Sequence, residues 1–236
     1  MFLRFPIQIF KRIHYYRNMA EKNLVFVYGT LKSGEPNYDI LTNEDNGICN
    51  YIGKAKTYDK WPLVIASRYN IPFLLYAKNK GKHVIGELYL VDDVMLKKMD
   101  ELECHPTYYE RKEENVQVLE SKDKTYCTDG KTLKPWIYFL TEYKSYMMEL
   151  PHLEEYSSEG SHGLKYVSRY NRTGPPYILE CKNIHFILGS FSGDDEEIAT
   201  GHAERNLSES LHEIQYLHEN FIFSRQNDLS NYEYLK

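Results

Sequence analysis

The spacing of apolar and polar residues along the chain predicts a sheet of short strands. An apolar run at residues 24–27 stops abruptly in a turn at residues 28–31, as a buried strand does at the rim of a sheet. The stretches 86–91 and 115–119 alternate in polarity as half-buried strands do, and residues 134–140 resemble another strand. These elements predict a mainly β domain with helical insertions.

The turn of Tyr28, Gly29, Thr30 and Leu31 is a candidate ligand-binding feature. Glycine lets the backbone approach a ligand closely, and successive N–H groups that point into one concavity can hold a carboxylate or a developing oxyanion. A tight turn with a buried tyrosine explains the same residues. An acidic feature further along the chain favours the ligand-binding interpretation.

Residues 92–106 form that feature and are predicted to contain a helix of about three turns. Asp92 is a candidate N-cap and Pro106 a stop signal. At about 100° per residue, Met95, Met99 and Leu102 form one apolar stripe. The pattern therefore predicts an amphipathic helix with one face in the core.

Glu103 falls on the buried side of this helix, at its end, whereas Glu101 faces water. Desolvation there would raise the pKa of Glu103 toward a value useful for proton transfer, so Glu103 is the candidate general acid/base. A solvated acid at a frayed helix terminus is the alternative. Lys32 and Arg111, which lie near these motifs in the sequence, are expected to be solvated surface charges.

Length and composition agree with a soluble enzyme but do not identify one. The chain has 236 residues and a net charge of −5, which fits one domain of about 150 residues with extensions. Its 22 tyrosines are spread along the sequence and do not alternate with basic residues, so nothing indicates nucleic-acid binding. No apolar run approaches the roughly 20 residues that span a membrane. We expect neither a nucleic-acid nor a membrane partner.

Cysteine and histidine spacing gives no metal motif. The four cysteines, Cys49, Cys104, Cys127 and Cys181, form no CxxC pair, and the nine histidines form no HExxH arrangement. A reduced intracellular protein without a metal or cofactor is the simplest interpretation, with disulfides or a zinc site as the minor alternative.

Two segments differ in character from the central domain. Residues 1–22 are a basic N-terminal extension whose composition is compatible with a mitochondrial presequence. A start at Met19 that omits this segment is an equal alternative, and a cytoplasmic protein is favoured. Residues 173–236 are a C-terminal extension, expected to be weakly ordered, with a candidate amphipathic helix at 207–221. A docking helix or regulatory arm is the alternative for that extension.

Several motifs occur in an order that resembles the gamma-glutamylcyclotransferase superfamily, and within it the gamma-glutamylaminecyclotransferase (AIG2-like) branch. The motifs are Val-Phe-Val-Tyr-Gly-Thr-Leu-Lys at 25–32, Gly-Glu-Pro-Asn at 34–37, 62–66, Asn-Ile-Pro-Phe-Leu-Leu at 70–75, 86–89, Asp-Glu-Leu-Glu at 100–103 and 157–166. Each motif is weak alone, but their combination is specific. The resemblance covers residues 23–172.

The resemblance implies an α+β fold, a gamma-glutamylcyclotransferase-like mixed β-barrel with flanking helices. It also implies that the turn Tyr28 to Leu31 binds the glutamyl moiety of a small-molecule substrate and that Glu103 is the catalytic acid/base. His162 lies in a segment that would close over the barrel. No metal or cofactor is implied, and the protein is expected to be a monomer.

The implied activity is that of a gamma-glutamylamine cyclotransferase. Attack by the glutamyl α-amine on the γ-carbonyl closes a five-membered lactam, 5-oxoproline, and releases an amine, for example lysine from ε-(γ-glutamyl)lysine left after proteolysis of transglutaminase cross-links. The α-amine is normally an ammonium, so a general base is needed. Two alternatives remain: the same chemistry on γ-glutamyl amino acids or glutathione-derived peptides, and a non-catalytic ligand-binding protein on the same barrel.

Overall fold

The fold is organised around β1, the apolar strand that leads into the turn. The structure, a computed structural model, describes residues 23–124, 126–160, 163–168, 171–172 and 181. Its strands are β1 Asn23–Val27, β2 Cys49–Thr57, β3 Leu63–Ile65, β4 Pro72–Leu74, β5 Ile85–Val91, β6 Glu110–Glu113, β7 Val116–Ser121, β8 Thr132–Leu133 and β9 Trp136–Phe139. Its helices are α2 Asp39–Thr42, η1 Glu44–Asn46, α3 Asp93–Leu102 and η2 Ser145–Glu149.

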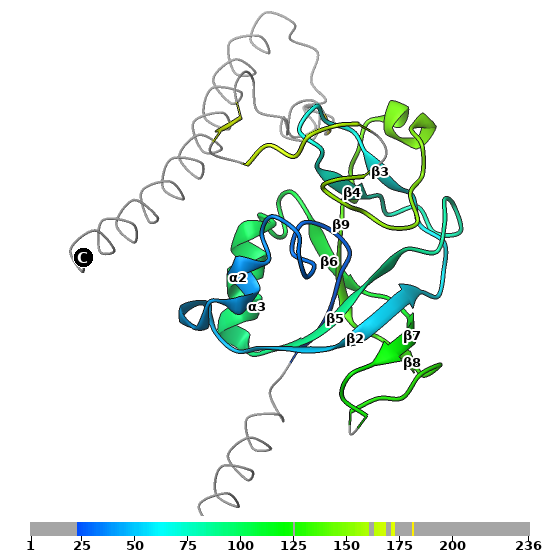
Figure 1. Cartoon of the computed structure of the whole chain (residues 1–236). Helices are drawn as coiled ribbons and strands as arrows, with labels where there is room; N and C mark the ends of the chain where they lie inside the picture. The colour runs from blue at the N-terminus through cyan, green and yellow to red at the C-terminus, as the bar shows by residue number, and fades with distance from the viewer. Residues whose placement is uncertain (1–22, 125, 161–162, 169–170, 173–180, 182–236) are drawn as a thin grey trace, which may run out of the picture. The chain divides into compact units, whose positions relative to one another are not determined.

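Seven of the strands form one curled sheet in the order β6-β9-β1-β5-β2-β7-β8 (Figure 1). All neighbouring strands are antiparallel except β1 and β9, which run parallel with Val25 opposite Trp136. A separate ribbon of β3 and β4 meets the sheet through an isolated bridge between Leu75 and Leu140. The sheet is mixed and curls into a half-barrel, which confirms the α+β prediction. The strands predicted at 86–91, 115–119 and 134–140 are all present.

Large side chains from distant segments pack together against the sheet. Phe26, Leu88 and Phe139 are almost completely buried in one cluster with Trp61 and Tyr156. The Trp61 and Phe139 rings lie with their centroids 4.7 Å apart. Burial of such side chains contributes about 1.5–3 kcal/mol each, so this cluster holds the sheet in its curled form.

Helix α3 follows the sequence prediction at its start. The Asp92 carboxylate accepts a hydrogen bond from the Met95 N–H at 2.9 Å and caps the helix. Met95, Met99 and Leu102 are buried, whereas Val94 is 61% exposed. The predicted apolar stripe is therefore the buried face of the helix.

The end of α3 differs from the prediction, which gave Pro106 as the stop. The helix ends at Leu102 because Cys104 adopts a left-handed backbone conformation with φ of 51°. The N–H groups of Cys104 and His105 then donate back to the carbonyls of Glu101 and Asp100, at 3.3 and 2.9 Å. This pair of bonds is the Schellman motif, which usually has glycine in the left-handed position. Glu103 is the C-cap, and its side chain leaves the helix where the chain reverses direction.

Both extensions lie outside the described residues, apart from Cys181. Contacts divide the chain at Ser168, near the boundary expected from the sequence. No helix in the described part is long and apolar enough to cross a membrane. The domain boundaries themselves stay a prediction.

We expect Met99→Ala to lower the free energy of unfolding by about 2–5 kcal/mol, because it removes a fully buried side chain and leaves a cavity. Val94→Ala is the matched control in the same helix and is expected to change it by less than about 0.5 kcal/mol. Urea unfolding followed by circular dichroism measures both values. Equal effects would contradict the packing of α3.

A chain of residues 19–172 is expected to fold and to keep the specific activity of the full protein. The strands and helices named above lie between residues 23 and 149, and the contact from the Val167 N–H to the Tyr69 carbonyl is also retained. Thermal unfolding and activity per mole check the expectation. Loss of folding on removing only residues 177–236 would show that the C-terminal extension packs on the domain.

Candidate active site

The turn at residues 28–31 begins directly after β1. The Tyr28 side chain is buried, and its hydroxyl donates a hydrogen bond to the Tyr138 carbonyl on β9 at 2.8 Å. The Lys32 N–H donates to the Gly29 carbonyl at 3.1 Å and closes the turn. A Cβ atom on Gly29 would lie 3.0 Å from the Pro72 ring. Glycine thus lets the turn lie close against the start of β4.

The rest of the turn is held by Asn37. Its N–H donates to the Thr30 carbonyl and its side-chain amide donates to the Thr30 hydroxyl, both at 2.9 Å. Within the part of the chain that the structure describes, the N–H groups of Gly29, Thr30 and Leu31 donate to no protein acceptor. These three consecutive N–H groups therefore remain candidates for binding a ligand oxygen, and the binding role of the turn stays a prediction.

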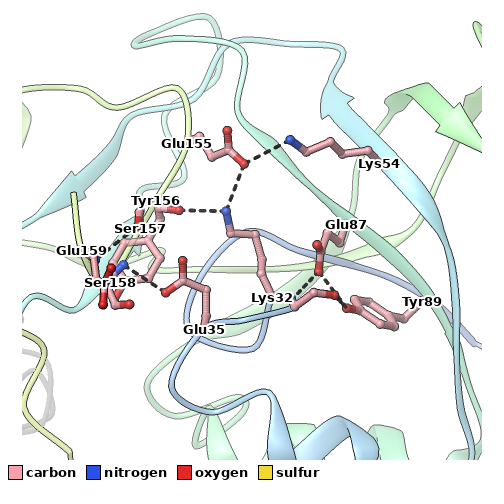
Figure 2. A network of polar contacts seen from close by, with 11 residues as sticks. Lys32, Glu35, Lys54, Glu87, Tyr89, Glu155, Tyr156, Ser157, Ser158 and Glu159 are labelled. Carbon is pink, nitrogen blue, oxygen red and sulfur yellow. Dashed lines mark hydrogen bonds and ion pairs between the residues drawn. The ribbon is translucent and has the colours of Figure 1, made fainter. Parts of the chain in front are cut away.

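Lys32, expected at the surface, is instead 6% exposed. Its ammonium donates to the Tyr156 carbonyl at 2.8 Å and pairs with the Glu155 carboxylate at 3.3 Å. Figure 2 shows Lys54 approaching the same carboxylate, at 3.5 Å. A buried ammonium is costly unless it is paired and hydrogen-bonded. The expectation for Lys32 was wrong because its partners come from a segment far away in the sequence.

Two further carboxylates hold the chain just after the turn (Figure 2). Glu87 on β5 accepts from the Ser33 N–H and from the Tyr89 hydroxyl, both at 2.7 Å. Glu35 accepts from the Ser158 N–H at 3.0 Å. The segment that follows the turn is thus fixed to the sheet on one side and to residues 155–158 on the other.

Asn70 connects the same segments from a third direction. It is fully buried in a left-handed conformation with φ of 53°, and its side-chain amide donates to the Ser158 and Leu164 carbonyls at 2.9 and 3.2 Å. The Tyr166 hydroxyl lies 3.2 Å from the Asn37 amide oxygen. Motifs at 34–37, 70–75 and 157–166, which are far apart in the sequence, therefore meet beside the turn. His162 lies outside the described residues.

The length of helix α3 determines where Glu103 lies relative to the turn after β1. The Asn23 amide donates to the Asp93 carboxylate at 2.8 Å, so α3 starts beside the start of β1. Its 10 residues rise about 15 Å, and the 5 residues of β1 extend about 16 Å. The helix and the strand are thus similar in length, and the effect of the Glu103 charge on Tyr28, the residue after β1, indicates that their ends lie near each other.

The half-buried Glu103 acts electrostatically on two tyrosines. Burial raises the pKa of the Tyr28 hydroxyl well above its usual range, and the charge of Glu103 raises it further. The pKa of Tyr138 is raised by burial first, then by the neighbouring Asp100, with Glu103 adding to the rise. Because such effects require proximity, the Glu103 carboxylate lies near both hydroxyl groups. Glu101, by contrast, is exposed and pairs with Lys98 at 3.5 Å.

A group beside Glu103 was missed by the sequence analysis. The Tyr138 hydroxyl donates to the Asp100 carboxylate at 2.7 Å, and Arg111 forms two bonds to the same carboxylate at 2.8 and 3.2 Å. The Arg111 guanidinium also lies over the Trp136 ring, 4.7 Å from its centroid. Arg111 is therefore paired and half-buried, and its assignment as a solvated surface charge was wrong. Only the tertiary pairing of β6 with β9 brings these residues together.

The structure thus brings together an N–H-lined turn and a half-buried carboxylate around Tyr28. The turn can bind an oxyanion or a carboxylate, and the carboxylate can accept a proton. Among the described residues, no group of three or more His, Cys, Asp or Glu side chains is arranged to hold a metal ion.

Comparisons with known proteins find one family of relatives. The family model for "Gamma-glutamyl cyclotransferase, AIG2-like" matches residues 25–158, which include both the turn and Glu103. Gamma-glutamylaminecyclotransferase of Mus musculus is 41% identical over 148 residues, covering 63% of this chain and 98% of that protein. The Homo sapiens protein of the same name is 38% identical over 156 residues, covering 63% and 99%.

Solved structures show the same fold. The crystal structure of an AIG2-like protein from Mus musculus has a TM-score of 0.60 and 40% sequence identity, and the match covers 64% of this chain and 99% of that one. The chain therefore belongs to the AIG2-like gamma-glutamyl cyclotransferase family.

Proposed function

We propose that the protein is a gamma-glutamylamine cyclotransferase that releases 5-oxoproline and a free amine. The observation that carries this proposal is the meeting of the turn and Glu103 at Tyr28, where Glu103 raises the pKa of the tyrosine hydroxyl. A proton acceptor and a set of oxygen-binding N–H groups are the two parts that intramolecular aminolysis of an amide requires.

In the proposed reaction, the turn at 28–31 binds the glutamyl part and Glu103 removes a proton from its α-ammonium. The free amine attacks the γ-carbonyl carbon, the carbonyl π electrons move to oxygen, and a tetrahedral intermediate forms. Glu103 gives its proton to the leaving nitrogen and accepts the second proton of the attacking nitrogen, which is positively charged in the intermediate. The oxygen electrons then re-form the carbonyl and the bond to the leaving nitrogen breaks. The released amine takes up the remaining proton from Glu103, so the lactam is neutral and the carboxylate is restored. Holding the substrate folded supplies a proximity advantage of several kcal/mol in favourable cases. The scheme uses no metal or cofactor.

The free N–H groups of Gly29, Thr30 and Leu31 support the binding role of the turn. Their neighbours are held by Asn37 and Lys32, so the turn needs little rearrangement when an anion binds. Preorganised N–H groups of this kind stabilise an oxyanion more effectively than mobile water.

Two other functions fit parts of the site. The same chemistry could act on γ-glutamyl amino acids or glutathione-derived peptides, and the fold could serve a non-catalytic ligand-binding protein. A pure binder has no chemical need for a base beside the turn, which favours an enzyme. The names of the Mus musculus and Homo sapiens relatives favour γ-glutamylamines as the substrates.

We further propose that the protein acts as a monomer in the cytoplasm and that lysine linked through its ε-amine is one leaving group. The four cysteines are free thiols, as expected in a reducing compartment. A mitochondrial protein with residues 1–22 as presequence is the alternative location.

Incubation of the purified protein with ε-(γ-glutamyl)lysine, γ-glutamylalanine and glutathione tests the proposal. Chromatography of 5-oxoproline and of the released amine distinguishes the three outcomes. Release from none of these compounds would contradict the cyclotransferase activity.

Glu103→Gln is expected to lower kcat by at least about 100-fold, because the amide keeps the shape of the side chain and cannot accept a proton, and general base catalysis contributes about 10²–10⁴-fold. Stopped assays of 5-oxoproline release measure the change. A folded variant that retains more than about a tenth of wild-type kcat contradicts the role of Glu103.

Glu101→Gln is the matched control, two residues away on the exposed side of the same helix. Its kcat and KM are expected to stay within about twofold of wild type, as for most exposed substitutions. Thermal unfolding of both variants checks that they are folded.

Selectivity is expected to favour an alkylamine leaving group. A γ-glutamyl amino acid places a carboxylate next to the scissile nitrogen, whereas ε-(γ-glutamyl)lysine does not, and Lys32 and Arg111 are already paired with protein carboxylates. We therefore expect kcat/KM for ε-(γ-glutamyl)lysine to exceed that for γ-glutamylalanine by at least about tenfold. Competition assays with both substrates measure the ratio. A ratio of one or below would favour the amino acid specificity and leave the role of Glu103 unchanged.

A further inference from the structure

Tyr138 is linked to both parts of the candidate site. It lies on β9, is 5% exposed, and accepts the Tyr28 hydroxyl on its main-chain carbonyl at 2.8 Å. Its own hydroxyl donates to the Asp100 carboxylate on α3 at 2.7 Å. One residue thus connects the turn to the helix that ends at Glu103.

Asp100 holds the end of that helix in two ways. Its main-chain carbonyl accepts the His105 N–H at 2.9 Å and closes the helix, while its carboxylate binds both Tyr138 and Arg111. Because residues three apart lie on the same side of a helix, Asp100 is one turn before Glu103 on the side of the sheet. The last turn of α3 is therefore fastened through Asp100 to β9 and β6.

This arrangement limits the movement of Glu103. Glu103 is the C-cap, and beyond it the Tyr109 N–H donates to its main-chain carbonyl at 3.3 Å. The position of its side chain therefore depends on how the preceding helical turn is attached. A hydrogen bond to a charged group is stronger than one between neutral groups, and a displacement of about 1 Å at a reacting group can cost about 10²-fold in rate. Loss of the Tyr138 hydroxyl would free one of the two attachments of Asp100.

We propose that Tyr138 is a positioning residue for the reaction, which acts through Asp100 and Arg111 to set the distance between Glu103 and the turn that holds the substrate. The proposal rests on the proposed cyclotransferase function. Tyr138 then has two separate roles. The main-chain carbonyl supports Tyr28 and the turn, and the side-chain hydroxyl supports Glu103.

Tyr138→Phe removes the second role and keeps the first, because the main chain and the ring remain. We expect kcat with a γ-glutamylamine substrate to fall by about 10-fold, because a shift of Glu103 by less than about 1 Å costs less than about 10²-fold in rate. The Kd of the product 5-oxoproline, which reports the turn, is expected to stay within about twofold. Steady-state kinetics and isothermal titration calorimetry measure the two quantities.

Tyr76→Phe is the matched control. The Tyr76 hydroxyl also donates to a carboxylate, that of Glu114 at 3.3 Å, and neither residue belongs to the site. Its kcat and product Kd are expected to match those of wild type. Thermal unfolding of both variants shows whether a change in kcat merely reflects a loss of stability.

Asp100→Asn, combined with Tyr138→Phe in a double-mutant cycle, tests whether Tyr138 acts through Asp100. If Tyr138 acts through Asp100, the two losses in kcat are less than multiplicative in the double variant. Independent, multiplicative losses would overturn the proposal, and so would unchanged kcat in Tyr138→Phe. An equal loss of kcat and product affinity would also overturn it, because it would show general loosening of the site. Wild-type protein that releases no 5-oxoproline contradicts the proposed function itself, and the inference with it.

Discussion

The parallel alignment of β1 with β9 is the constraint on which the candidate site depends. Parallel neighbours end at the same edge of a sheet, so Tyr28 leaves β1 where β9 presents Tyr138. A buried hydroxyl needs a hydrogen-bond partner, and the main-chain carbonyl of β9 provides one for Tyr28. The turn after β1 therefore has a fixed starting point, and the other contacts around it refine a position that the sheet already sets.

Four of the charged side chains near this edge have partners within the protein, either an opposite charge or a main-chain N–H group. Lys32 is paired with Glu155 and Arg111 with Asp100, while Glu35 and Glu87 accept main-chain N–H groups. Buried charges without such partners would be destabilising. The consequence for recognition is that the turn offers a substrate main-chain N–H groups, whose positions are fixed by the fold.

Local features of the sequence were sufficient to predict β1, β5, β7, β9 and the start of α3, because alternation, capping and helical periodicity depend on near neighbours. The remaining strands, including the long central β2, were not predicted. The left-handed Cys104 was not predictable, since glycine is the usual residue there. The burial of Lys32 was missed because its acceptor, the Tyr156 carbonyl, is 124 residues away in the sequence. Arg111 was missed for a similar reason, since only tertiary packing places it beside α3 and over a ring on β9.

The similar lengths of α3 and β1 restrict which sequence changes related proteins can accept in this part of the chain. Exchanging side chains leaves the helix end where it is, but inserting one residue between Asp92 and Glu103 would rotate the carboxylate by about 100° and advance it by about 1.5 Å. Glu103 would then turn away from Tyr28 toward solvent, on the side where Glu101 now lies. Among proteins built on this fold, the number of residues between the helix cap and the acid should therefore be kept more strictly than the residues themselves.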